Sequence, residues 1–209
     1  AGALSTYKFD DGPQTGLVTG DPVLEWRSND TTPRQFIQAT ATKRPTFNSA
    51  GINSKNTVVF DGVDDLLVAN TAFLTGANGA MFIIYRVDDV PNAYQILIAS
   101  SDEASTTRYV AAYGRGNSAN NHLNLDQNNN GTADLLDGNT AVANTTNYIA
   151  AFISDGTTAR ARLNGVEQTL NADTGANNGD WWDDATAKDN VTIGALKTSA
   201  ESVFLIGKI

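Results

Sequence analysis

The clearest spacing for chemistry lies among the oxygen-bearing side chains of residues 126 to 137. Five of them stand at positions one, three, five, nine and twelve of that segment, with glycine at position six: Asp126, Asn128, Asn130, Asp134 and Asp137. This is the spacing of a calcium-binding loop, in which a sharp glycine turn folds successive oxygens around one hard cation. The last position holds aspartate in place of the usual glutamate, and no helical pattern flanks the segment. Two interpretations remain, a weak Ca²⁺ site and a plain hairpin loop rich in asparagine and glycine.

A second candidate site is the loop in which two adjacent tryptophans, Trp181 and Trp182, stand between Asp180 and Asp183. Neighbouring side chains point to opposite faces of an extended segment, so we expect at least one indole to be exposed. An exposed tryptophan beside carboxylates suits sugar binding, because the ring covers the apolar C–H face while the carboxylates accept the hydroxyls. The loop therefore predicts a ligand-binding site at these four residues. The alternative is that one tryptophan anchors the loop on the core and the other lines a contact between subunits.

The residue types that are missing argue against an enzyme. The chain has no cysteine, and its one histidine, His122, stands in a strand-like segment without a serine nucleophile motif. Glycosidases of the β-sandwich type use a closely spaced pair of glutamates as acid and nucleophile. The few glutamates of this chain lie far apart in the sequence. No catalytic residue is expected.

Charge and hydropathy exclude two classes of partner. The 23 acidic residues outnumber the 14 basic ones, and the net charge of −9 repels a phosphate backbone. No apolar run approaches the roughly 20 residues that cross a bilayer. We therefore expect neither nucleic-acid binding nor membrane insertion.

The elements that position these residues are predicted to be β-strands. Short runs rich in β-branched and aromatic residues recur along the chain and are closed by Gly, Asn or Asp. The clearest runs are 57–60, 80–87, 95–99, 108–113, 148–154, 159–163, 191–195 and the segment from Val203 to Ile209. Their regular spacing predicts an all-β sandwich or barrel.

Two turns join three of these runs into an antiparallel meander over about 148–170. An Asp-Gly turn comes first, and Asn164-Gly165 comes second. An Asn-Gly pair tolerates positive φ at both central positions, which the type I′ hairpin turn requires. In the middle strand, Arg160 and Arg162 alternate with small or apolar residues, so we expect one solvated face.

Three motifs resemble the concanavalin-A-like, laminin-G-like jelly-roll domains of bacterial surface proteins and phage virion proteins. They are Arg44-Pro45-Thr46-Phe47, Gly51-Ile52-Asn53, and the stretch from Val58 to Leu66 that reads Val-Val-Phe-Asp-Gly-Val-Asp-Asp-Leu. Segments 23–26, 80–87, 151–165, 191–194 and 204–209 agree in order, so the resemblance covers nearly the whole chain. It implies one jelly-roll β-sandwich of two packed antiparallel sheets over residues 1–209.

The resemblance also implies a function. It favours a non-enzymatic recognition or decoration module, outside the cell on a virion or bacterial surface, whose ligand is a glycan or cell-surface polysaccharide. The alternatives are a purely structural virion or appendage protein without a small ligand and, as a weaker option, a polysaccharide-active enzyme. Within the Phe-Asp-Gly-Val-Asp-Asp stretch, Asp64 and Asp65 are expected to accept backbone N–H bonds in a turn; a metal role is the alternative.

One departure from the family concerns the segment from Val203 to Ile209. In the family the matching segment runs on into a longer apolar strand that completes the sandwich. We expect that the chain is part of a larger protein or that another molecule supplies the missing strand. The hypothesis that follows is that Val203 to Ile209 pairs with a neighbouring protein in an assembly.

Overall fold

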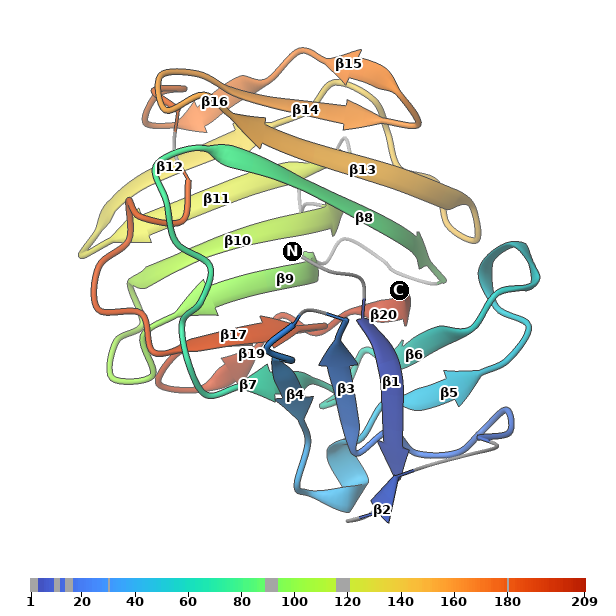
Figure 1. The fold of residues 1–209 in the computed structure, drawn as a ribbon. Coiled ribbons are helices and arrows are strands. Elements are labelled where there is room, and N and C mark those ends of the chain that lie inside the picture. The colour runs from blue at the N-terminus through green and yellow to red at the C-terminus, as the bar shows by residue number, and fades with distance from the viewer. Residues whose placement is uncertain are drawn as a thin grey trace.

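The computed structural model describes residues 4–9, 12–13, 17–29, 31–88, 94–115, 121–179 and 181–209. Within them, two large antiparallel sheets pack face to face (Figure 1), which confirms the predicted all-β, antiparallel sandwich. The larger sheet has, in spatial order, β16 (Asn171–Thr174), β12 (Thr132–Asp137), β11 (Asn124–Asn129), β10 (Arg108–Arg115), β9 (Gln95–Ser101), β17 (Asn190–Ile193), β7 (Leu67–Ala69), β4 (Gln35–Ile37), β3 (Glu25–Ser28), β1 (Leu4–Phe9) and β2 (Gly12–Pro13).

The smaller sheet covers the core from the other side. Its spatial order is β15 (Val166–Gln168), β14 (Ala159–Leu163), β13 (Asn147–Ser154), β8 (Gly79–Val87), β20 (Ile206–Lys208), β6 (Thr57–Asp61) and β5 (Thr46–Asn48). A short hairpin of β18 (Leu196–Lys197) and β19 (Glu201–Ser202) and two single-turn 3₁₀ helices, η1 (Ala41–Lys43) and η2 (Ile52–Ser54), complete the described elements. None of the described helices has the length and apolar character needed to cross a membrane.

The core lies between the two sheets and follows the period-two alternation of the strands. Phe60, Tyr85 and Phe152 are buried at its centre. The two sheets also meet through a hydrogen bond, in which the Tyr85 hydroxyl donates to the Gly114 carbonyl at 2.8 Å. The close approach requires glycine, because a Cβ at Gly114 would lie 2.6 Å from the Tyr85 ring.

The predicted meander is confirmed. Strands β13, β14 and β15 pair in sequence, and Arg160 and Arg162 are exposed on the outer face, as their alternation indicates. The turn between β14 and β15 has φ of 50° at Asn164 and 82° at Gly165, the two positive values of a type I′ turn.

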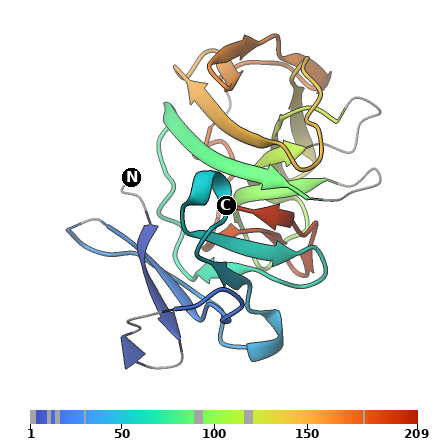
Figure 2. The same cartoon turned by 90° about the vertical axis from the view of Figure 1, so that its right-hand side faces the viewer.

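The N-terminal strands β1 to β4 are not among the clearest strand runs of the sequence, which begin at residue 57. They extend the larger sheet beyond β7, and in Figure 2 they lie at one side of the molecule, in blue, away from the orange strands of the meander. Because β3 and β4 have only four and three residues, they are too short to show a period of two in the sequence.

The prediction for Val203 to Ile209 is wrong in one respect. Only Ile206–Lys208 is a strand, and it is an internal one, because Gly207 pairs with Phe60 of β6 on one side and Val87 of β8 on the other. The backbone of Ile206 is also held from the core, where its N–H donates to Gln95 Oε1 at 2.6 Å. Residues 206–208 are therefore paired inside the sheet, contrary to the expected pairing with a neighbouring protein.

Candidate ligand-binding site

The tryptophan loop does not present an indole to solvent. Trp181 and Trp182 are each 3% exposed, so the expectation of at least one exposed ring is wrong. The alternation argument fails because the segment is a turn, not an extended strand, and both rings point inward with their centroids 5.7 Å apart. The loop is held by Asp184, which accepts from the Trp181 N–H, and by Lys188, which donates to the Trp182 carbonyl.

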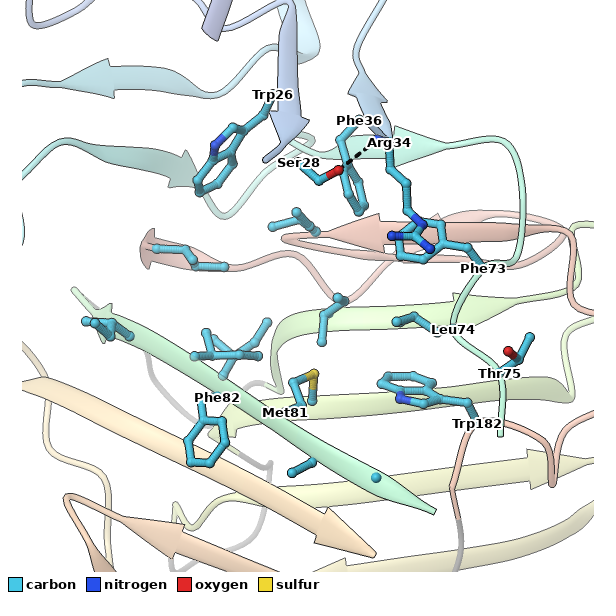
Figure 3. A pocket seen from close by; sticks show the side chains of 18 of the residues that line it. Trp26, Ser28, Arg34, Phe36, Phe73, Leu74, Thr75, Met81, Phe82 and Trp182 are labelled. Carbon is cyan, nitrogen blue, oxygen red and sulfur yellow. Dashed lines mark hydrogen bonds between the residues drawn. The ribbon is translucent and has the colours of Figure 1, made fainter. Parts of the chain in front are cut away.

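Asp183 is not among the residues that line a pocket with the two rings. Asp183 is exposed, and Asp180 lies outside the described residues. The two indoles instead line the wall of a groove between the sheets, in which Trp182 faces Leu74 and Met81 (Figure 3).

The segment predicted as a calcium loop is a regular β-hairpin. Strands β11 and β12 pair in register from Asn124↔Asp137 to Asn129↔Thr132, and the turn at Asn130 and Gly131 has positive φ at both residues. The hairpin of the alternative interpretation is therefore present.

The five proposed calcium ligands are spread along this hairpin and over its two faces. Asp126 and Asn128 lie on the face opposite Asp134, whose Oδ1 accepts from the Ala176 N–H. Asn130 accepts from Arg108 Nε at the turn, and Asp137 stands at the far end beside Asn124. The structure therefore does not bring these oxygens together, because a period-two strand separates residues that a loop would gather.

The Phe-Asp-Gly-Val-Asp-Asp stretch forms the expected turn. Asp61 Oδ1 accepts from the N–H groups of Val63 and Asp64, and Asp65 Oδ2 accepts from the Asp61 N–H at 3.0 Å. The carboxylates of Asp61, Asp64 and Asp65 lie within 4.8 Å of one another. Burial, together with the charge of Asp61, raises the pKa of Asp65 to about 7. These backbone bonds account for Asp61 and Asp65 as acceptors in the turn, and Asp64 takes part through its N–H instead of its carboxylate.

A different cluster of polar and aromatic side chains lies on the outer face of the larger sheet. In β10, Val110 and Ala112 point into the main core, so Tyr109 and Tyr113 point to the opposite face. The paired strands add polar groups to the same face, and β9 is preceded by a further tyrosine. We call this surface the tyrosine face and define it by Tyr94, Tyr109, Tyr113, Asn124, Asp126 and Asp137.

Asp126 is the centre of the tyrosine face. It pairs across the strands with Ala111, which places it between the two tyrosines of β10. Its Oδ2 accepts from the Tyr109 hydroxyl at 3.2 Å and from the Tyr113 hydroxyl at 3.1 Å. The ring of Tyr94 packs on Tyr113 with a centroid distance of 5.1 Å. Tyr94, Tyr109 and Asp126 are partly exposed, so rings and carboxylate are both within reach of a ligand.

A second group of hydrogen bonds lies beside Asp126. Asn124 donates from Nδ2 to Asp137 Oδ1 at 2.9 Å, and His122 Nδ1 lies 3.2 Å from the other oxygen of Asp137. The Asn124 side chain is buried, and its Oδ1 has no hydrogen-bond partner among the described residues. A buried acceptor of this kind gains free energy from any donor that reaches it. His122, which stands just before β11, is thus part of a polar cluster with Asn124 and Asp137.

The electrostatics of the tyrosine face are those of a negative, partly dehydrated surface. The pKa of Asp126 is raised, because the effect of burial outweighs the hydrogen bonds from Tyr113 and Tyr109, which lower it. Burial also raises the pKa of Asp137 and of Tyr94, and the carboxylates of Asp126, Asp173 and Asp137 add to the shift at Tyr94. The tyrosine hydroxyls therefore stay protonated as donors, and the face offers acceptors and ring surfaces but no free positive charge from these residues.

Sequence reasoning found parts of this face without recognising it. In the sequence, Asp126 and Asp137 belong to the calcium spacing, and Tyr109 and Tyr113 belong to one predicted strand. The available signal was their spacing of four residues within a predicted strand, which places both rings on one face. The pairing with Asp126 depends on the register between β10 and β11, which no local pattern specifies.

Comparisons with known proteins give likeness of fold and no match of sequence. No protein-family model matches the chain, and no curated protein sequence matches it. Among solved structures, the CBM40 module of the Ruminococcus gnavus IT-sialidase bound to α2,3-sialyllactose is 18% identical with a TM-score of 0.53, covering 63% of this chain and 72% of that chain. The same module bound to α2,6-sialyllactose gives the same values.

A leech intramolecular trans-sialidase complexed with 2,7-anhydro-Neu5Ac is similar over a shorter share of its length. It is 18% identical with a TM-score of 0.52, and the match covers 63% of this chain but only 20% of that protein. At such identities the likeness establishes the architecture alone. The chain has the antiparallel β-sandwich of jelly-roll type that these sialidase modules have.

Proposed function

We propose that the chain acts as one non-enzymatic module that binds a neutral glycan at the tyrosine face. The observation that carries the proposal is the placement of Asp126 between two tyrosine hydroxyls, beside partly exposed rings, on the outer surface of a sheet. The fold likeness to modules whose structures contain sialyllactose supports the choice of a glycan as ligand.

The chemistry of the tyrosine face suits a sugar. The rings of Tyr94 and Tyr109 offer apolar area for the C–H face of a pyranose, while the carboxylate of Asp126 accepts its hydroxyl protons. Asn128, which pairs with Tyr109 on the same face, adds a partly exposed amide. Because Tyr113 and Asp126 hold each other in place, little side-chain freedom is lost on binding.

The charges favour a neutral sugar over an acidic one. Asp126, Asp137 and Asp173 raise the pKa of Tyr94 together, so three carboxylates act on the same region. The nearby cation Arg108 is engaged by Asp102 and Asn130. An anionic sugar would meet repulsion here, and the overall charge of −9 adds to it.

The experiment is a glycan array followed by calorimetry on the best neutral ligand. We expect the neutral ligand to bind at least about tenfold more tightly than its sialylated form, a difference of about 1.4 kcal/mol. Asp126→Asn and Tyr109→Ala should each weaken binding by about tenfold, because each removes one part of the contact. The matched control is Asp183→Asn, the same exchange at the exposed aspartate of the tryptophan loop. Loss of binding in Asp183→Asn with Asp126→Asn unaffected would place the ligand at the tryptophan loop and overturn the proposal.

The proposal also includes the location of this module. The resemblance to phage virion and bacterial surface domains supports a place outside the cell, on a virion or a bacterial surface.

The alternative function, a structural part of such an assembly without a small ligand, is favoured by one observation. Phe82, Ile84 and Ile149 are 70%, 52% and 49% exposed on the outer face of the smaller sheet, an apolar surface suited to a protein contact. An array without any binding would favour this alternative.

A further inference from the structure

The outer face of the larger sheet is covered at one end and bare at the other. One row of paired residues crosses this face from strand to strand: Thr192, Ala99, Ala111, Asp126, Leu135 and Thr174. The first three are fully buried, the next two are partly exposed, and the last, on the edge strand β16, is exposed. Exposure along the row therefore increases in one direction, from β17 toward the edge of the sheet.

The covered end lies under the segment 194–205, which contains the hairpin of β18 and β19. Leu196 belongs to the same buried apolar cluster as Ala99 and Ala111, and Val203 packs against that cluster. Tyr109 also packs against it. The segment 194–205 is therefore a wall that stands beside Tyr109 on the outer face of the sheet.

This wall is fastened to the strands beneath it. The Asn190 side chain donates from Nδ2 to the Lys197 carbonyl at 3.1 Å, and the Ser101 hydroxyl donates to the same carbonyl. The Lys197 ammonium forms an ion pair with Glu103. Because backbone and side chain of Lys197 are both held, a ligand on the tyrosine face meets a wall that is already in place.

The face is covered on a second side as well. Tyr113, Asn124 and Asp137 form the neighbouring row of paired residues, and all three are buried. Tyr94 packs on the ring of Tyr113. Asp126 therefore stands at a corner of the accessible surface, which extends from there across β12 toward β16.

The bare part of the row presents three different groups in order. Asp126 offers a carboxylate, Leu135 an apolar side chain and Thr174 a hydroxyl. Leu136 points into the main core, so Leu135 points to the outer face. At the usual spacing of strands, Asp126 and Thr174 lie about 10 Å apart, which is the reach of about three linked pyranose rings. An apolar side chain between two polar ones suits a chain of sugars, because it covers the C–H face of the middle ring.

We propose that the tyrosine face binds the end of a linear, neutral glycan chain. The terminal unit lies at Asp126 and Tyr109, and the following units leave the protein across Leu135 and Thr174. This inference rests on the proposed function, glycan binding at the same face. An internal stretch of a chain would continue along the row on both sides of Asp126, and on one side the wall of residues 194–205 covers the sheet.

The first test is a chain-length series measured by calorimetry. The probes are linear neutral oligosaccharides of one to six units, taken from the glucose, mannose or galactose series that binds best on the array. We expect the affinity to rise by about tenfold or more from one unit to three and then to stay level, because only about three units reach the edge of the sheet. A constant affinity at every length, or one that keeps rising to six units, would overturn the inference.

Trisaccharides of the same series, blocked by a bulky group at one end or the other, test the chain end directly. One block should lower the affinity by about tenfold or more, because the added group meets the wall of residues 194–205. The other block should change the affinity little, because that end projects past β16. Equal binding of the free trisaccharide and both blocked forms would overturn recognition of a chain end.

Two variants separate this inference from the proposed function. Leu135→Ala should lower the affinity for the trisaccharide by about fivefold and so reduce the gain from chain length, because it removes apolar contact with the second unit. Asp126→Asn should weaken the binding of every length. The matched control is Ile149→Ala, which removes an exposed apolar side chain from the outer face of the smaller sheet and should change neither.

The outcomes of these variants are distinguishable. A gain from chain length that survives unchanged in Leu135→Ala would overturn the path across β12 and leave the site at Asp126 in place. Equal binding by Asp126→Asn and the unchanged chain, or no binding of any series, would overturn glycan binding at the tyrosine face itself.

Discussion

At the scale of single residues, the functional proposal rests on how Asp126 is held. Its position between Tyr109 and Tyr113 fixes one carboxylate oxygen by two hydroxyl donors and leaves the other for a ligand. A surface aspartate with free rotamers would lose entropy on binding, whereas this one is already ordered. Preorganisation of this kind is what separates a binding surface from a merely polar one.

Asp65 provides a prediction about pH. Burial raises its pKa to about 7 from an ordinary value of 3.8, so between about pH 4 and pH 7 the folded chain holds a proton there that the unfolded chain releases. The free energy of unfolding contributed by this group is therefore full below pH 4 and is lost as the pH rises through 7. Urea denaturation between pH 4 and pH 8 measures the slope. Asp65→Asn keeps an acceptor for the Asp61 N–H and removes the titration, so its profile should be flatter; identical profiles for both chains would refute this origin of the slope.

At the scale of elements, the sequence patterns predict the long strands, whereas they leave two interpretations for the segment 126–137. The run at β8 and the meander follow from alternation and from Asn-Gly and Asp-Gly turns, and both are confirmed. Asn130-Gly131 carries the same hairpin signal as Asn164-Gly165, and both have two positive φ values. The calcium spacing and the hairpin signal coincide in this segment, because Gly at position six suits either structure.

This hairpin leads to a prediction about metal. Because its oxygens point to two faces of a regular ladder, we expect millimolar Ca²⁺ to leave the Tm unchanged and EDTA to have no effect. Differential scanning fluorimetry with and without each reagent is sufficient. A Tm that rises with Ca²⁺ and falls for Asp126→Asn and Asp134→Asn alike would restore the calcium loop.

Short strands and contacts between distant side chains are the features that the sequence does not reveal. Strands β3, β4 and β7 have three or four residues each, too few for a period to be visible. The inward turn of both tryptophans and the contact of Tyr109 with Asp126 follow from tertiary packing and strand register. Neither leaves a local signature in the sequence, which is why the tyrosine face could be read only from the structure.

Gly114 gives a test of the packing between the sheets. An added Cβ would lie 2.6 Å from the Tyr85 ring and 2.9 Å from Leu97 Cδ2, so Gly114→Ala should lower the free energy of unfolding by about 1–3 kcal/mol. Gly138→Ala is the matched control, because its nearest contact is an ordinary 3.4 Å to the Leu123 carbonyl. Denaturant titration of both variants gives the comparison. Equal losses would mean that the contact between Gly114 and Tyr85 is not tight.

At the scale of the whole molecule, the two sheets present different outer surfaces. The larger sheet carries the tyrosine face on its outer surface, and the smaller sheet carries the exposed apolar side chains of Phe82 and Ile84 on its own. A ligand surface on one side and an attachment surface on the other suit a module built into a larger assembly. The main core between the sheets separates the two surfaces.

The central claim, a glycan site at the tyrosine face, is tested most directly by NMR titration of the chain with the best neutral glycan from the array. The account predicts that backbone shifts change first and most at Tyr94, Tyr109, Asn124 and Asp126 and stay unchanged at Trp181 and Trp182. Shift changes concentrated at the tryptophan loop, or the absence of saturable changes with any glycan, would contradict it.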